Sequence, residues 1–322
     1  MNLVSAFISP SSAEETALSQ TESLVIRTLL YFEIFNHPLL FDEIIQCMGK
    51  PVAQPELIKT QVEQMLRKGY IHEHRGYYLV NCNKDAIQKR IEGEKLAHKY
   101  LKKARFFSSI IARFPFIRSI CLSGSISKYY MDKKSDIDYF IITKPGRMWV
   151  ARTLLVLFKK IFLLNSKKYF CVNYFITEES MDVRVRNIYS AMEMSSLIPT
   201  YNYSKYETLM SINAWVKDFY PNFPNRGKEW VIKNRTYFIK PLLERFFGGV
   251  VGEKLDIFCY RLTLRHWKKK FSHFDPSTFD HRLRNGRNES KHHPLGYQQI
   301  VLQKLLQKTQ QFEFTHKLSL SE

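Results

Sequence analysis

The chain has 322 residues, of which 45% are hydrophobic and 25% are charged. These proportions exclude a wholly disordered, collagen-like or low-complexity chain, and the length favours two or three domains. Lys and Arg (49) outnumber Asp and Glu (30), and the net charge of +19 predicts an anionic partner or substrate.

The cysteines and the apolar runs bear on the cellular location of the protein. Five cysteines are spread along the chain without a C-x-x-C pair, so neither a disulfide framework nor a zinc site is expected, and a reducing, cytoplasmic location fits. Residues 1–20 do not read as a secretory signal and are expected to form a flexible tail. The apolar runs are too short for a membrane span, so no membrane partner is expected.

Residues 1–82 carry 6 basic and 9 acidic side chains, a net charge of −3, and a recognisable order of elements begins at residue 21. The pattern predicts a first helix that ends before Pro38, since the residue preceding a proline avoids the α region. It predicts two more helices, Phe41–Met48 and one that starts at Pro55, and then two short strands around Gly76. This order resembles a winged helix-turn-helix. Its negative charge argues against binding of duplex DNA and favours a packing or protein-contact role.

Residues 83–200 carry 22 basic and 10 acidic side chains and hold the most informative pattern. After a long basic helix, a strand over residues 117–122 ends at Ser123-Gly124-Ser125, and ten residues later a second strand starts with Asp136-Ile137-Asp138. Residues i and i+2 of a strand face the same way, so Asp136 and Asp138 are expected to project together. Paired carboxylates repel one another, and a divalent cation relieves the repulsion. Gly124 permits close approach of the backbone, while Ser125 and neighbouring N–H groups can hold phosphate oxygens.

This succession of strand, Gly-Ser, gap and Asp-apolar-Asp-apolar resembles the signature of the polymerase-β-like nucleotidyltransferase superfamily, over roughly residues 100–200. The resemblance implies that Asp136 and Asp138 are catalytic and hold two Mg²⁺ ions, and that Gly124 and Ser125 bind the phosphates of an NTP. The implied reaction transfers a nucleoside monophosphate to a hydroxyl of an acceptor, which is a nucleic acid, a small molecule or a protein.

The family also has a third carboxylate on a later strand. The predicted strand over residues 169–176 contains no acid, and Asn173 stands where one is expected. Asp182, between two apolar residues, is the better candidate for the third metal ligand, and Glu193 on the next helix is another. Without a third acid the domain would bind nucleotide and not turn it over. The alternative is therefore a non-catalytic regulator that senses nucleotide or binds nucleic acid.

Residues 201–322 carry 21 basic and 11 acidic side chains and are expected to be helical, with helices at 206–217, 230–247, 253–271 and 295–312. The basic cluster from Arg261 to Lys270 is either a solvated face or an acceptor surface, on which Trp267 or Tyr297 would stack on bases. The sequence thus predicts an α+β or α/β multidomain protein. Its parts are a winged-helix-like module (21–82), a central nucleotidyltransferase domain with a mixed sheet and helices (83–200), and a helical C-terminal domain (201–322).

Overall fold

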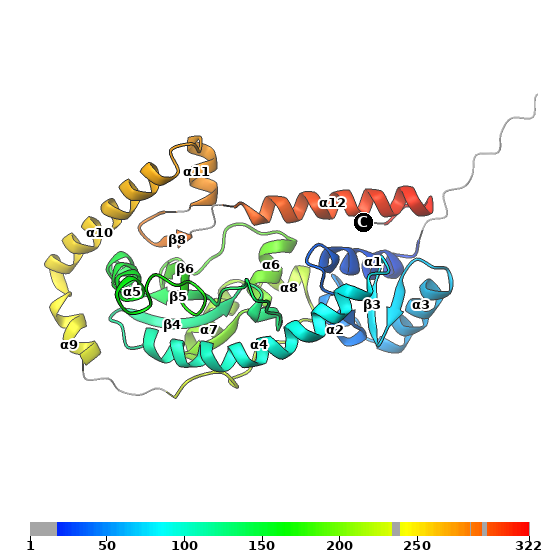
Figure 1. Cartoon of the computed structure of the whole chain (residues 1–322), viewed down its shortest axis with the longest axis horizontal. Helices are drawn as coiled ribbons and strands as arrows, with labels where there is room; N and C mark the ends of the chain where they lie inside the picture. The colour runs from blue at the N-terminus through cyan, green and yellow to red at the C-terminus, as the bar shows by residue number, and fades with distance from the viewer. Residues whose placement is uncertain (1–17, 234–238, 284, 292–294, 322) are drawn as a thin grey trace, which may run out of the picture.

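The computed structural model describes residues 18–233, 239–283, 285–291 and 295–321, which form a mixed α/β fold (Figure 1). The N-terminal helices lie at one end of the molecule, a sheet lies at the centre, and the C-terminal helices pass around the far end and return above the sheet. Of the tail expected at residues 1–20, residues 1–17 lie outside the described part. Leu18 is buried, and Ser19 caps the first helix through a reciprocal pair of hydrogen bonds with Glu22.

The N-terminal segment folds as the sequence predicts, with one added strand. Its elements are α1 (Gln20–Glu33), β1 (Leu39–Leu40), α2 (Phe41–Cys47), α3 (Pro55–Arg67), β2 (His72–His74) and β3 (Tyr77–Leu79). The strands form a small antiparallel sheet in the order β1-β3-β2. The short strand β1, which directly precedes α2, gave no recognisable pattern in the sequence.

The central sheet has five strands in the order β7-β4-β5-β6-β8. Strands β4 and β5 are antiparallel, β5 and β6 are parallel, and the edge strands β7 and β8 are antiparallel to their neighbours. The elements of this region are α4 (Lys84–Ile111), β4 (Ile117–Ser123), the short 3₁₀ helix η1 (Ile126–Lys128), β5 (Asp138–Thr143), α5 (Met148–Phe162), β6 (Cys171–Thr177), α6 (Ile188–Ser195) and β7 (Ile198–Tyr201).

Alternate residues of β5 supply two different hydrophobic cores, as the two-residue period of a strand requires. Tyr139 and Ile141 face the core that α4 and α5 cover. Phe140 and Ile142 face a larger core, which also contains side chains from the N-terminal segment, from α6 and from the last helix of the chain. The N-terminal segment therefore shares a continuous core with the central sheet.

The C-terminal segment departs most from the sequence prediction. It contains α7 (Tyr203–Ile212), α8 (Val216–Phe219), α9 (Ile239–Phe246), α10 (Gly249–Lys270), α11 (Pro276–Arg282), β8 (Glu289–Lys291) and α12 (Tyr297–His316). The segment is not wholly helical, because β8 pairs with β6 and completes the central sheet. The helix predicted over residues 230–247 is wrong for its first four residues, because residues 230–233 are not helical. Helix α11 and strand β8 were not predicted.

Helix α12 returns to the N-terminal segment and packs against α1 and α6 (Figure 1). Phe312 is 4% exposed and contacts the ring of Tyr70, while Lys308 forms an ion pair of 3.2 Å with Glu33. Among the described residues, none of the helices has both the length and the apolar composition that a membrane span requires.

We expect Phe312→Ala to lower the free energy of unfolding of the whole chain by about 3–5 kcal/mol, because it removes a buried aromatic ring from the shared core. The matched control is Phe314→Ala on the same helix, where the ring is 87% exposed and the expected change is within roughly 0.5 kcal/mol. Urea denaturation of both variants measures the difference. Equal stabilities would contradict the view that α12 is part of that core.

Candidate active site

The turn at Gly124 is built against the side chain of Asp138. Strand β4 ends at Ser123, whose backbone lies opposite Asp138 in the β4–β5 ladder. Gly124 follows with φ +69°, and a Cβ atom at this position would lie 2.6 Å from Oδ2 of Asp138. Only glycine fits here, because the backbone is left-handed and the carboxylate fills the space of a side chain.

The residues after Gly124 hold the turn in place. The Ser127 hydroxyl donates to the carbonyl oxygen of Gly124 at 2.8 Å, and the Lys128 ammonium donates to the same oxygen at 3.2 Å. The Ser125 hydroxyl makes only a weak contact of 3.5 Å with the sulfur of Met131. That hydroxyl lines the pocket described below and is available for a stronger acceptor, such as a phosphate oxygen.

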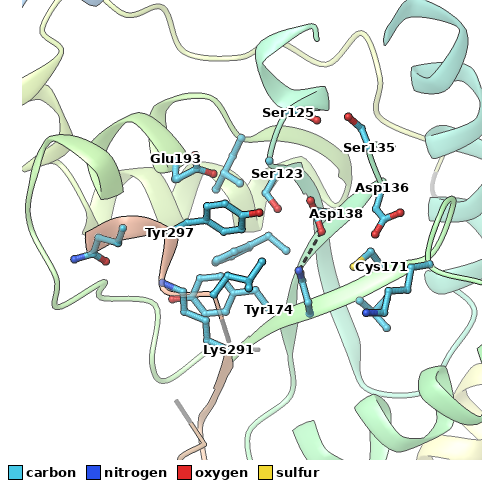
Figure 2. A pocket seen from close by; sticks show the side chains of 18 of the residues that line it. Ser123, Ser125, Ser135, Asp136, Asp138, Cys171, Tyr174, Glu193, Lys291 and Tyr297 are labelled. Carbon is cyan, nitrogen blue, oxygen red and sulfur yellow. Dashed lines mark hydrogen bonds between the residues drawn. The ribbon is translucent and has the colours of Figure 1, made fainter. Parts of the chain in front are cut away.

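Asp136 and Asp138 line the same pocket and lie near each other (Figure 2). Strand β5 begins at Asp138, two residues later than predicted, so Asp136 lies just before the strand. Burial raises the pKa of Asp138 to about 6, and the negative charges of Asp136 and Glu193 contribute to the rise. The structure thus brings the two predicted aspartates together, at an energetic cost that a bound cation would relieve.

Two side chains of β6 contact the Asp138 carboxylate. The Asn173 amide donates a hydrogen bond to it at 3.0 Å (Figure 2), and the neighbouring Cys171 thiol helps to lower its pKa against the effect of burial. The Oδ1 atom of Asn173 is buried and has no hydrogen-bond partner among the described residues. This amide oxygen could serve as a further neutral ligand if a cation binds at the aspartates.

The two candidates for the third acid lie in different places. Asp182 is 54% exposed, forms an ion pair of 3.3 Å with Arg186 and does not line the pocket. Glu193 does line it, but its carboxylate is 2.7 Å from the Lys128 ammonium. The structure therefore does not bring Asp182 to the aspartates. Among the described residues, no group of three His, Cys, Asp or Glu side chains is placed to hold a metal ion.

The pocket has a volume of about 1020 Å³, at the upper end of the range for small-molecule sites. Its wall includes the Gly124 turn and side chains of α5, β6, α6 and α10, together with β8 and the start of α12. The N-terminal segment contributes Tyr31, Phe32, Phe35 and His37. Such a volume has room for a nucleotide and part of a second substrate.

Several pocket residues were missed by the sequence analysis. Lys128 and Cys171 carry no local signal, because their role depends on α6 and β5, which lie elsewhere in the sequence. Arg152 did carry one: it interrupts the apolar side of α5, a position where a basic residue needs an explanation. Tyr297, named before only as a stacking residue, points toward the aspartates in Figure 2.

No protein-family model, curated protein or solved structure matches this chain at a significant level. What the site does must therefore follow from its own residues.

We expect Gly124→Ala to weaken Mg²⁺-dependent NTP binding by roughly 10- to 100-fold, since the new methyl group displaces a proposed metal ligand. The control is Gly146→Ala, where φ is +65° and no atom lies within 4 Å of the new Cβ. Both variants should lose about 1–2 kcal/mol of stability from the strained backbone. Calorimetric titration measures binding; equal affinities of the two variants would show that the contact with Asp138 is unimportant.

The stability of the metal-free protein should depend on pH through Asp138. Its pKa in the folded state, about 6, exceeds the ordinary pKa of an aspartate, 3.8, so the folded state binds more protons than the unfolded state between these values. The free energy of unfolding therefore falls as pH rises through this range, by up to about 3 kcal/mol. We expect Asp138→Asn to be more stable than wild type near neutral pH and to lose this advantage toward pH 4. Urea denaturation across this range tests the expectation, which a pH-independent difference would contradict.

Proposed function

We propose that this chain is a Mg²⁺-dependent nucleotidyltransferase, which transfers a nucleoside monophosphate from an NTP to a hydroxyl of an acceptor and releases pyrophosphate. The observation that carries the proposal is the contact between the Gly124 turn and Asp138. It joins a loop suited to phosphate and a pair of carboxylates suited to Mg²⁺ at one point of a large pocket.

The strand arrangement supports the resemblance to polymerase-β-like nucleotidyltransferases. The Gly-Ser turn follows β4, the aspartates lie at the start of the adjacent antiparallel strand β5, and β6 then runs parallel to β5. The element order of residues 21–82 and its sheet order β1-β3-β2 support a winged-helix-like module. We keep 83–200 as the proposed catalytic unit, to which residues 289–291 add an edge strand.

The side chains present suit Mg²⁺. This ion is usually held by one or two carboxylates, with substrate phosphates and water completing its octahedron, so two aspartates and a nearby amide oxygen are sufficient protein ligands. In the proposed complex Asp136 and Asp138 hold the metal, and the Gly124 turn and Ser125 hold the triphosphate. Bound Mg²⁺ would stabilise the attacking and leaving oxygens electrostatically.

We assign the role of the third acid to Glu193 in place of Asp182. In the ligand-free protein Glu193 is paired with Lys128, and Lys128 also contacts the Gly124 carbonyl. A triphosphate in the Gly124 turn offers Lys128 a more highly charged partner. Lys128 would then leave Glu193, whose carboxylate becomes available to accept the proton of the acceptor hydroxyl.

The second candidate function is a regulator that binds Mg²⁺-NTP without transferring it. It is favoured by the fact that no third acid converges with the aspartates among the described residues. Both candidates require Mg²⁺-dependent NTP binding, and only the first requires label transfer. The label-transfer experiment described next also identifies the acceptor and the preferred NTP.

The test is incubation of the full chain with Mg²⁺, cell extract and each NTP labelled at the α-phosphate. We expect label on an acceptor, and transfer roughly a thousandfold slower in Asp136→Asn and Asp138→Asn. Glu193→Gln should retain NTP binding and lose transfer. Asp182→Asn is the control and should behave as wild type.

NTP binding without transfer in the wild type would favour the regulator. Absence of Mg²⁺-dependent NTP binding would exclude both candidates. Loss of transfer in Asp182→Asn, with Glu193→Gln active, would overturn the assignment of the third acid.

A further inference from the structure

Arg152 is a buried cation on the wall of the same pocket. It lies on α5 and is 9% exposed. Its guanidinium carbon is 4.8 Å from the ring centre of Trp267 and 5.6 Å from that of Trp149. The two indoles stabilise the positive charge through their π faces and restrict the orientation of the side chain.

Arg152 has no anionic partner among the described residues, unlike Arg90 and Arg118. The Arg90 side chain, 2% exposed, pairs with Glu43 at 2.7 Å and Glu94 at 3.3 Å, and Arg118 pairs with Glu244 at 2.9 Å. For Arg152, burial alone acts on the guanidinium and lowers its pKa to about 10. A buried unpaired charge is costly, so its retention on a pocket wall indicates a ligand of opposite charge.

Arg152 and Asp138 line the pocket from different elements, α5 and β5. Lys159 lies seven residues further along α5 and also lines the pocket, which corresponds to two helical turns or roughly 10 Å. The charges of both Asp136 and Arg152 act on Lys159. Lys159 therefore lies within electrostatic range of both Arg152 and Asp136.

The surroundings of Arg152 are basic. Lys270, three residues beyond Trp267 on α10, lines the same wall, as do Lys159 and Lys160 of α5. A planar guanidinium donates paired hydrogen bonds to phosphate oxygens, and the additional lysines favour a dianion over a single carboxylate.

We propose that Arg152, held between Trp149 and Trp267, is the centre of a phosphate-binding subsite separate from the aspartate pair. The bound phosphate belongs either to the NTP tail or to the acceptor. The choice between these two sources rests on the proposed transferase function, whereas the existence of the subsite does not depend on it.

The test uses the full chain in EDTA with inorganic phosphate as the probe, against chloride of equal ionic strength. Phosphate should raise the melting temperature of the wild type, and Arg152→Met should bind phosphate about tenfold more weakly or worse. Without ligand, Arg152→Met should melt at or above the wild-type temperature, because the variant removes an unpaired buried charge. The control Arg265→Gln changes an exposed arginine of α10 outside the pocket and should bind as wild type.

Asp138→Asn should keep metal-free phosphate binding, so failure of the transferase proposal is distinguishable from failure of the subsite. A second measurement is made with Mg²⁺ present. If Arg152→Met binds NTP more weakly than wild type but binds the nucleoside monophosphate equally well, the subsite belongs to the NTP tail. If the NTP-saturated wild type binds additional phosphate and Arg152→Met does not, the subsite belongs to the acceptor.

Equal phosphate binding by Arg152→Met and wild type would overturn the proposal. So would a large drop in the ligand-free melting temperature of Arg152→Met, which would make Arg152 a structural support for the two tryptophans.

Discussion

The site depends on one steric constraint: a carboxylate oxygen of Asp138 occupies the space that a side chain at position 124 would need. The constraint follows from the pairing of β4 with β5, which sets Ser123 opposite Asp138. Because the turn and the carboxylate are in contact, a phosphate held by the turn would lie beside a metal held by the aspartate, as proposed. The central sheet keeps this contact rigid, since β4 and β5 have neighbours on both sides.

The pocket contains buried charges of both signs that the described protein does not neutralise locally. Asp136 and Asp138 repel each other, and Arg152 lacks a carboxylate partner among the described residues. By contrast, the buried Arg90 is paired with Glu43. In the proposed complex, Mg²⁺ would supply a cation for the acids and a phosphate group would supply an anion for the arginine. Ligand binding would then offset both desolvation costs and stabilise the folded protein.

The sequence predicted the part of the site that is local in the chain. Gly124, Asp136 and Asp138 lie within fifteen residues of one another, and the spacing of turn and strand was enough to bring them together. The third acid was not predictable in this way. Asp182 matched an apolar-acid-apolar pattern, but residues 181–186 form no strand, and the side chain pairs with Arg186, four residues further along the chain. Glu193 enters the pocket because α6 packs against the larger core, which is a long-range event. Similarly, β8 gave no signal in its three residues and forms only because β6 offers an open edge.

The most direct test of the account is a crystal structure with Mn²⁺ in place of Mg²⁺ and a non-hydrolysable nucleoside triphosphate. The account predicts an anomalous peak for manganese between the carboxylates of Asp136 and Asp138, with the triphosphate oxygens against the Gly124 turn and Ser125. Manganese and triphosphate bound together at another place, with these two aspartates unliganded, would contradict it.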